Sequence, residues 1–397
     1  MTTPFQKDGL HTAPMAQRLA SLGSERWAVH FEARRRVAAG EDIIELTIGE
    51  PDVPTPSALV ETAAQAMRDG RTGYAGGRGE PGLLAAIARH YTKRSGRTVT
   101  PENVLALPGT QAALTVAMMT LVSEGDEVLL PDPYYATYEG VVRASGAQFV
   151  SVPMDAENGF HLTADYVEAA ITPATKVLLL NSPHNPTGAV LTRQEITGIG
   201  AVCAKHDLWI VSDEVYESLI FHGQFASPFD QADLARRTLV TSSISKSHAA
   251  PGFRSGWMVG PEWVLNAAQG IAEALLFGNQ PFIADMTEHA MGDGGEAALA
   301  MRANYMRRIS LLAKIFEKSE KLTPLLPEAG MFMLVDVSAT GLDGNSFAEG
   351  LLDAGVAVMP GGSFGAQAKP FIRLSLTVPD EVLVEGANRI CAFAAGV

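Results

Sequence analysis

The feature that most constrains the fold is a regular alternation of short apolar runs with helical patterns in the middle of the chain. The apolar runs lie at 104–107, 127–130, 148–152, 177–180, 208–211, 239–241 and 257–259. Stretches between them, such as 112–122 and 193–206, space their apolar residues as one face of a helix does. Strands that are apolar on both faces are typical of sheets covered by helices on both sides. We therefore predict an α/β fold with one large, mainly parallel, seven-stranded sheet flanked by helices.

A second pattern begins after about residue 300. A long helical stretch is followed by strand-like runs at 331–337, 356–359 and 371–376. The segment before residue 49 contains a helical stretch but little sheet, and we expect it to pack on the C-terminal part. Since 397 residues suit two domains, the predicted units are an N-terminal arm and part of a small α+β domain (1–48), a large domain (49–299), and the rest of the small domain (300–397).

Charge and composition exclude several classes of partner. The chain has 44 acidic and 30 basic residues, a net charge of −14, which disfavours binding to nucleic acid or anionic lipid. No apolar run approaches the roughly 20 residues that cross a bilayer, and the first residues carry no secretory pattern. The two cysteines, Cys203 and Cys391, are widely separated and predict neither a disulfide framework nor a metal site. We expect a cytoplasmic protein without membrane or nucleic-acid partners.

Candidate site residues follow the predicted strands, where ligands of open parallel sheets bind. Gly109, Thr110 and Gln111 come after 104–107 and lead into a helix, whose first N–H groups and dipole favour a phosphate. Tyr135, after 127–130, can stack on a planar heterocycle. Taken singly, a turn with a helix cap explains the first group and core packing explains the second.

The next two strand ends carry an amide and a carboxylate. Asn185 lies in a proline-rich turn after 177–180 and can donate to a phenolate oxygen. Asp213 follows 208–211, and a carboxylate directly after an apolar strand is costly unless it meets a cation. A protonated pyridine nitrogen is such a cation, and Tyr216 could donate to the hydroxyl of the same ring. A helix cap explains Asp213 equally well if this element is considered alone.

The strand at 239–241 is followed by a lysine among hydroxyl groups. Lys246 lies close to Ser243, and Arg254 follows eight residues later. A desolvated lysine amine forms imines, and an arginine can bind phosphate through two parallel hydrogen bonds. Together the strand ends describe a phosphate clamp, a stacking ring, a pyridinium partner and an imine-forming lysine, a combination that chance explains poorly.

These residues belong to ordered motifs that resemble a known family. The motifs are IGEPDVPTP, GYAGGRGEPG, LPGTQAAL, PDPYYATY, NSPHNPTG, SDEVY, SISKSHAAPGFRSGW and FIRLSL. Over nearly its whole length the sequence resembles the fold-type I, class I/II aminotransferases that depend on pyridoxal 5′-phosphate (PLP). The resemblance implies a PLP enzyme that moves amino groups between amino acids and 2-oxo acids.

The resemblance also implies roles for individual residues. Lys246 would hold PLP as an imine and then move the proton between the substrate Cα and the C4′ atom of the cofactor. Asp213 would keep the pyridine nitrogen protonated, Asn185 and Tyr216 would bind the ring oxygen, and Tyr135 would lie on the ring face. The implied phosphate contacts are Gly109, Thr110, Gln111, Ser243 and Arg254, with Tyr74 reaching the phosphate of a partner subunit in a homodimer with shared active sites.

Substrate contacts follow in the same way. Arg373 in FIRLSL would bind the α-carboxylate, with help from Asn185 and the Gly49 backbone. The segment 277–280 lies where the partner-subunit loop of the family approaches the substrate, so it is predicted to influence specificity. Within the family, the wording of NSPHNPTGA, HDLWIVSDEVY and AGMFMLVDV is similar to arginine–pyruvate transaminases, although aspartate aminotransferases share the same motifs.

Other interpretations of the sequence are weaker. The segment 77–82 satisfies G-x-G-x-x-G, but a helical stretch rather than a strand precedes it. The segment 361–365 satisfies G-x-S-x-G, but no histidine follows it, as a hydrolase triad in that order requires. A PLP-dependent carbon–sulfur β-lyase could keep every cofactor contact and stays open as an alternative. A regulator built on the same fold would need a basic DNA-binding region, which the sequence lacks.

Overall fold

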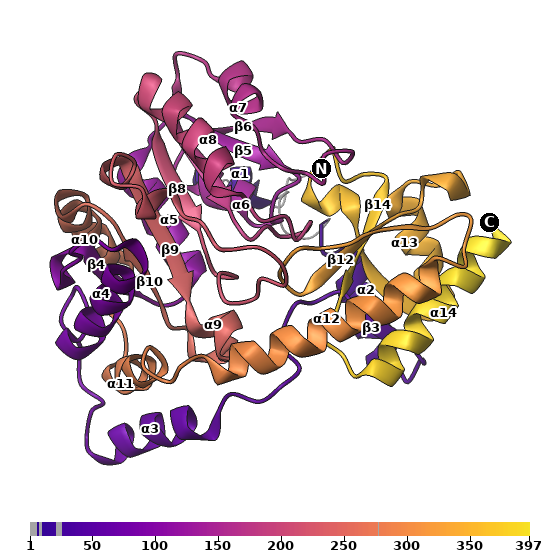
Figure 1. Ribbon diagram of the computed structural model, residues 1–397, viewed down its shortest axis with the longest axis horizontal. Helices are drawn as coiled ribbons and strands as arrows, with labels where there is room; N and C mark the ends of the chain where they lie inside the picture. Colours follow the sequence, from indigo (N-terminus) through magenta and orange to yellow (C-terminus); the bar gives the residue numbers. More distant parts are fainter. Residues whose placement is uncertain (1–5, 8–9, 21–25, 277) are drawn as a thin grey trace.

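The computed structural model describes residues 6–7, 10–20, 26–276 and 278–397. These residues form two main sheets with helices packed around them (Figure 1). The seven-stranded sheet has the order β4 (Val104–Leu107), β10 (Gly256–Val259), β9 (Thr238–Ser243), β8 (Trp209–Asp213), β7 (Thr175–Asn181), β5 (Glu127–Asp132) and β6 (Gln148–Pro153).

All seven predicted runs are strands of this one sheet, which confirms the predicted fold class. Strand β10 is antiparallel to both of its neighbours, β4 and β9, whereas the other pairs are parallel. The carboxyl ends of β5, β7, β8 and β9 therefore meet at one edge, where Asn181, Asp213 and Ser243 end their strands.

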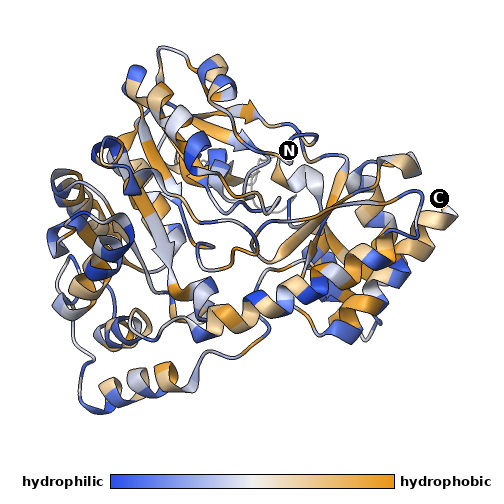
Figure 2. Cartoon of the chain, viewed as in Figure 1, coloured by the Kyte–Doolittle hydropathy of each residue, from blue (hydrophilic) through white to orange (hydrophobic). Residues whose placement is uncertain are grey.

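Helices cover both faces of the large sheet because successive strand residues point to opposite sides. In β4, Leu105 and Leu107 pack with two helices on one face of the sheet, whereas Val104 and Ala106 pack with three helices on the other face. Figure 2 shows apolar strands between helices whose outer surfaces are hydrophilic. The helices of this part are α3 (Ser57–Arg68), α4 (Pro81–Ser95), α5 (Thr110–Leu121), α6 (Tyr138–Ala144), α7 (Ala164–Ala170), α8 (Arg193–Lys205), α9 (Ile244–Ser247), α10 (Glu262–Leu276) and α11 (Pro281–Ala290).

The second sheet combines the two ends of the chain. Its order is β11 (Thr323–Leu325), β12 (Phe332–Asp336), β14 (Phe371–Ser375), β13 (Val356–Pro360) and β3 (Ile44–Leu46). The sequence predicted little sheet before residue 49 and missed β3, which pairs in parallel with β13. A three-residue strand is too short to give a periodic signal, and its partner lies 312 residues away, Val356 opposite Ile44.

The remaining helices surround this second sheet or lead to it. They are α1 (Pro14–Ala20), α2 (Ala28–Ala38), α12 (Glu296–Phe316), α13 (Gly344–Asp353) and α14 (Asp380–Gly396), and a pair of two-residue strands, β1 (Gln6–Lys7) and β2 (Leu10–His11), lies near the N-terminus. The long helix α12 runs from beside α9 to α14 (Figure 1). Within the described parts of the chain, no helix has both the length and the apolar character of a membrane span.

Candidate active site

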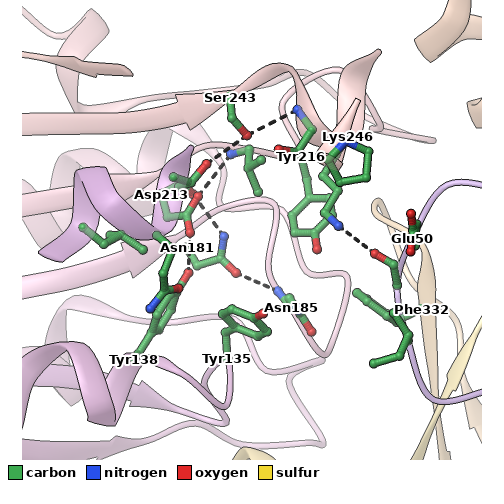
Figure 3. A pocket seen from close by; sticks show the side chains of 18 of the residues that line it. Glu50, Tyr135, Tyr138, Asn181, Asn185, Asp213, Tyr216, Ser243, Lys246 and Phe332 are labelled. Atoms are coloured by element: carbon green, nitrogen blue, oxygen red, sulfur yellow. Dashed lines mark hydrogen bonds between the residues drawn. The ribbon is translucent and has the colours of Figure 1, made fainter. Parts of the chain in front are cut away.

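A cavity of about 470 Å³ lies where the carboxyl ends of the large sheet face the second sheet (Figure 3). Most of the residues predicted from strand ends and motifs line it, although they come from distant parts of the chain. The predicted residues in its lining are Gly49, Thr110, Gln111, Tyr135, Asn185, Asp213, Tyr216, Ser243, Lys246, Arg254 and Arg373.

Lys246 projects from the short helix α9 into this cavity. Its Nζ donates a hydrogen bond to the Gly49 carbonyl oxygen at 2.6 Å. A side chain at position 49 would put its Cβ 2.1 Å from the Phe332 ring, so only glycine allows this approach of the backbone. Burial is the main reason that the pKa of Lys246 is lowered to about 8; Arg373 and Arg254 also lower it, while Glu50 opposes them. At pH 7 about one tenth of the amine is therefore neutral and nucleophilic, compared with under one thousandth at the ordinary pKa of about 10.4.

Asp213 ends β8 and is buried. Its Oδ2 accepts a hydrogen bond from the Tyr138 hydroxyl at 2.7 Å, and its Oδ1 accepts one from the Val215 N–H at 3.2 Å. Burial raises the pKa of Asp213 to about 6, against the opposing effect of these two donors. A cation at the cavity side would lower this pKa and stabilise the carboxylate, and a protonated pyridine nitrogen is a cation of suitable size.

Two residues on the Asp213 side were not predicted. Tyr138 begins α6 three residues after Tyr135, a spacing that puts both rings on one side, and their ring centroids are 5.5 Å apart. Asn181 ends β7; its Nδ2 donates to the Asp213 carbonyl oxygen at 3.0 Å and its Oδ1 accepts from the Asn185 N–H at 2.8 Å. Both lie in motifs that the sequence analysis singled out, so their positions at a helix start and a strand end were the available signals.

Asn185 and Tyr216 provide further polar groups in the lining of the cavity. Both are buried, and the Oδ1 of Asn185 accepts a hydrogen bond from Arg373 Nη1 at 3.1 Å. Burial raises the pKa of Tyr216 far above the ordinary value. The phenol therefore stays protonated and can donate a hydrogen bond to a ligand oxygen.

Gly109 shapes an anion-binding end of the cavity although it does not itself line the cavity. It precedes α5 with a φ of +86°, and a Cβ there would lie 2.5 Å from Arg254 Nη2. Glycine thus allows the guanidinium to lie against the free N–H groups at the start of α5, where the helix dipole favours an anion. The Thr110 hydroxyl donates to Ser243 Oγ at 2.9 Å, which fixes two hydroxyl groups beside these donors. The donor set fits a phosphate.

Arg373 is a buried guanidinium with spare hydrogen-bonding capacity. It is only 1% exposed and lies between the rings of Phe332 and Phe364, 3.9 and 4.4 Å from their centroids. Its Nη2 donates to the Thr47 carbonyl oxygen at 2.7 Å, whereas its Nε is buried with no hydrogen-bond partner in the described structure. Burial lowers the pKa of Arg373 to about 10. A buried arginine with an unused donor fits a substrate carboxylate.

Two predictions concern residues outside the cavity lining. Tyr74 is 86% exposed and does not line the cavity. Phe277 lies outside the described residues, and the rest of the segment 277–280 does not line the cavity either; Gly278 lies close to Ala75, beside Tyr74. The predicted roles of Tyr74 and this segment at the active site of a partner subunit stay predictions.

The cavity also has a wall that no strand-end motif indicated. Trp27, Ile48 and Glu50 come from the N-terminal segment, and Phe332 comes from the second sheet. Ile48 and Glu50 reach the site because β3 pairs with β13 and brings the residues that follow β3 to the cavity. They flank Gly49, which the resemblance implied as a substrate contact, whereas Trp27 and Phe332 were not among the predicted contacts.

Comparisons with known proteins agree with this arrangement. The family model for aminotransferase class I and II matches residues 41–390. The chain is 42% identical over 380 residues to the arginine–pyruvate transaminase AruH of Pseudomonas aeruginosa, covering 96% of this chain and 97% of that protein. It is 36% identical over 389 residues to the aspartate/prephenate aminotransferase of Cereibacter sphaeroides, covering 94% and 96%.

A solved structure has the same architecture. The aspartate aminotransferase from Thermus thermophilus with maleate matches with a TM-score of 0.90 and 32% identity over 96% of this chain and 100% of that chain. The buried acidic residue, the lysine of lowered pKa, the free N–H groups at the start of α5 and the spare donor of Arg373 fit the needs of a PLP enzyme of this type. The chain belongs to the class I and II aminotransferases and is a fold-type I, PLP-dependent enzyme that transfers amino groups from amino acids to 2-oxo acids.

Proposed function

We propose that the preferred amino donor is L-arginine or another amino acid with a cationic side chain, and that pyruvate is the acceptor. One observation carries this choice. Among the described residues that line the cavity, the cationic ones are Lys246, Arg254 and Arg373, and each of these has another proposed task. The carboxylate of Glu50, beside Lys246, is available to bind a cationic side chain of the amino donor. A guanidinium would gain a charge-assisted hydrogen bond there. The 42% identity to the Pseudomonas arginine–pyruvate transaminase supports the same choice.

The proposed work of the chain divides among five residues. PLP, when bound, supplies the electron sink that stabilises the substrate carbanion. Lys246 holds the cofactor and then carries the proton between the substrate Cα and C4′ of the cofactor. Asp213 keeps the pyridine nitrogen protonated, Asn185 and Tyr216 bind the ring oxygen, and Arg373 binds the α-carboxylate so that the Cα–H bond is held within reach of Lys246.

The proposed assembly is a cytoplasmic homodimer in which each subunit contributes to the site of the other through Tyr74 and the segment 277–280. The exposure of Tyr74 supports it, because a side chain that serves another subunit lies at the surface of its own. The proposed division of the chain puts residues 49–299 in the cofactor-binding domain and residues 1–48 and 300–397 in the small domain. Sedimentation analysis of the purified protein tests the dimer.

A donor screen tests the proposed specificity. With pyruvate as acceptor, kcat/KM for arginine is expected to exceed that for aspartate, and Glu50→Gln is expected to lower the value for arginine about tenfold because a charge-assisted hydrogen bond is lost. The control is kcat/KM for alanine as donor with 2-oxoglutarate as acceptor. The measured quantity is the ratio of kcat/KM for arginine to kcat/KM for alanine. An unchanged ratio in Glu50→Gln contradicts the role of Glu50. Release of ammonia and pyruvate without any acceptor would instead indicate the carbon–sulfur β-lyase.

The lowered pKa of Lys246 predicts how the cofactor-free protein captures PLP. The neutral amine attacks the aldehyde, so the rate is expected to fall about tenfold per pH unit below about 8 and to level off above it. A lysine with the ordinary pKa of about 10.4 would give a rate that still rises between pH 9 and 10. Stopped-flow absorbance with excess PLP measures the profile, and a rise that continues to pH 10 contradicts the assignment.

A further inference from the structure

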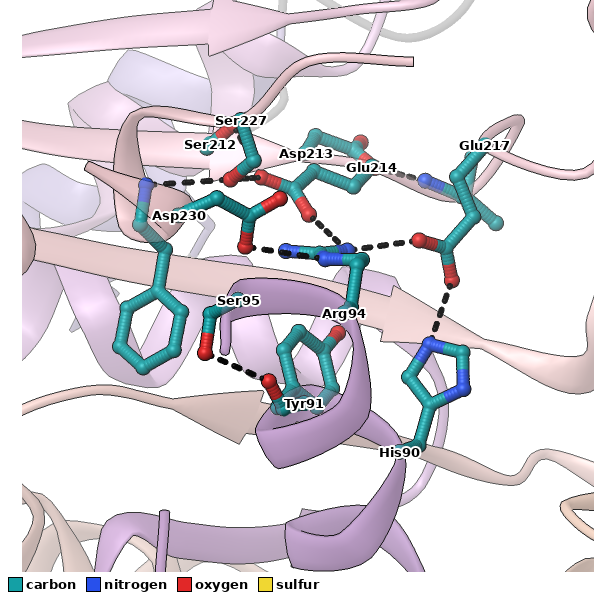
Figure 4. A network of polar contacts seen from close by, with 12 residues as sticks. His90, Tyr91, Arg94, Ser95, Ser212, Asp213, Glu214, Glu217, Ser227 and Asp230 are labelled. Atoms are coloured by element: carbon teal, nitrogen blue, oxygen red, sulfur yellow. Dashed lines mark hydrogen bonds and ion pairs between the residues drawn. The ribbon is translucent and has the colours of Figure 1, made fainter. Parts of the chain in front are cut away.

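An ion network of Arg94, Glu214, Glu217 and Asp230 lies beside the turn that follows β8 (Figure 4), and these four residues do not line the active-site cavity. Its centre is Arg94, near the end of α4. The Nη1 of Arg94 lies 2.9 Å from a Glu214 carboxylate oxygen and 2.6 Å from a Glu217 carboxylate oxygen, and its Nε lies 3.1 Å from Asp230. One guanidinium therefore contacts three carboxylates, and burial raises the pKa of Glu214 to about 7, so that this carboxyl group is partly protonated near neutral pH.

The network is largely closed to water. The Arg94 side chain is 15% exposed, and its guanidinium lies over the Tyr91 ring, 4.5 Å from the centroid. Glu214 is fully buried, and its Oε1 accepts hydrogen bonds from the hydroxyl groups of Ser212 and Ser227. Buried charges of this kind become strongly destabilising when their counter-charge is removed.

The turn divides its side chains between the network and the cavity. Asp213 and Tyr216 line the cavity, whereas Glu214 and Glu217 contact Arg94. The backbone of the turn is also hydrogen-bonded at these two glutamates. The Glu214 N–H donates to the Thr241 carbonyl oxygen, and the Glu217 N–H donates to the Glu214 carbonyl oxygen, both at 3.0 Å. A shift of the two glutamates would therefore move the aspartate and the tyrosine with them.

We propose that Arg94 is a positioning residue for the aminotransferase reaction: by holding Glu214 and Glu217, it fixes the turn that presents Asp213 and Tyr216 to the cofactor. Arg94 touches neither substrate nor cofactor and acts only through this turn. The inference rests on the proposed cofactor contacts of Asp213 and Tyr216. The lining of the cavity does not reveal that Arg94 is required, because Arg94 lies on α4 and not in the cavity.

The experiment replaces Arg94 and measures cofactor binding as well as turnover. Arg94→Met keeps the length of the side chain and removes the charge, and Arg94→Lys keeps the charge but loses the fork geometry. Arg237→Met is the matched control: Arg237 is also largely buried, but it binds Asp207 and the Leu208 carbonyl oxygen at the opposite end of β8. The readouts are the dissociation constant of PLP from absorbance titration of cofactor-free protein, kcat, KM and the melting temperature.

Arg94→Met is expected to raise the PLP dissociation constant and to lower kcat, each by roughly 10- to 100-fold, as losses of supporting contacts around a ligand site commonly do. Arg94→Lys is expected to recover part of both losses. Arg237→Met is expected to lower the melting temperature but to leave PLP affinity unchanged. The inference is overturned by Arg94→Met with wild-type PLP affinity and kcat, or by an equal loss of PLP affinity in Arg237→Met.

Two further variants keep the outcome decisive. If Arg94→Met does not fold, Glu217→Gln removes one of the two charges that hold the turn without changing its shape, and it is expected to weaken PLP binding in the same direction; wild-type affinity in that variant overturns the inference. Asp213→Asn in the same titration separates the two hypotheses. Unchanged PLP affinity and kcat in Asp213→Asn would mean that the proposed cofactor contact is wrong, whatever Arg94 does.

Discussion

Lys246→Ala is expected to lower the rate of transamination by at least about 10⁴-fold, because the variant loses both the amine that holds the cofactor and the group that moves the proton. General acid–base catalysis alone contributes roughly 10² to 10⁴. The carbonyl of Gly49 is the hydrogen-bond partner of this amine in the structure, and no other lysine lines the cavity in the part of the chain that the structure describes. No second lysine is therefore placed to form the imine in its stead.

The measurement is the single-turnover rate with PLP and amino donor, together with the absorption spectrum. Wild-type protein is expected to be yellow and to bind PLP irreversibly after borohydride reduction, whereas Lys246→Ala is expected to release PLP on denaturation. Lys205→Ala is the matched control, since Lys205 is 65% exposed and pairs with Glu168 at the surface. A Lys246→Ala rate within about tenfold of the wild type would contradict the proposed proton transfer.

Asp213→Asn is expected to cost roughly 10² to 10³-fold in kcat. The amide keeps the shape of the carboxylate but cannot hold a pyridinium, and breaking a buried ion pair costs about 3–5 kcal/mol. Asparagine has an acceptor oxygen for only one of the two hydrogen bonds from Tyr138 and Val215, so the loss includes a contribution from orientation as well as the lost charge. The electron sink of the cofactor weakens when its nitrogen is no longer protonated.

Comparison with a matched variant isolates this effect. Asp207→Asn replaces a carboxylate that is 96% exposed at the other end of the same strand, and asparagine tolerates the positive φ of 54° at that position. It is expected to leave kcat unchanged. A loss in Asp207→Asn equal to that in Asp213→Asn would show that the effect is structural and would contradict the assignment of Asp213.

The large sheet was predictable because each of its strands carries its own signal. A strand buried on both faces must be apolar along its whole length, and 104–107 and 208–211 are so in the sequence alone. The polar residues that follow such strands have to meet at one edge of a parallel sheet. For this reason Asp213, Ser243 and Lys246 could be assigned to one site before any coordinates were considered.

The second wall of the site could not be predicted in this way. Strand β3 is three residues long and pairs with β13 across more than three hundred residues of chain, so nothing local distinguishes it from a loop. The positions of Ile48 and Glu50 in the cavity depend on that pairing, although the resemblance had implied a substrate contact for Gly49 between them. Tyr138 was predictable only in part, because its motif was recognised in the sequence but the direction of its hydroxyl group was not.

The sequence by itself determined the fold class and the set of polar residues at the strand ends, including the lysine that we propose to hold the cofactor, because burial and parallel pairing impose patterns that are readable along the chain. Only the tertiary structure decided what those residues contact. Arg94 looks like an ordinary surface arginine on an amphipathic helix, and Glu214 looks like the neighbour of a catalytic aspartate. Their pairing depends on the packing of α4 beside the end of β8, and the energy of a buried ion pair depends on that packing.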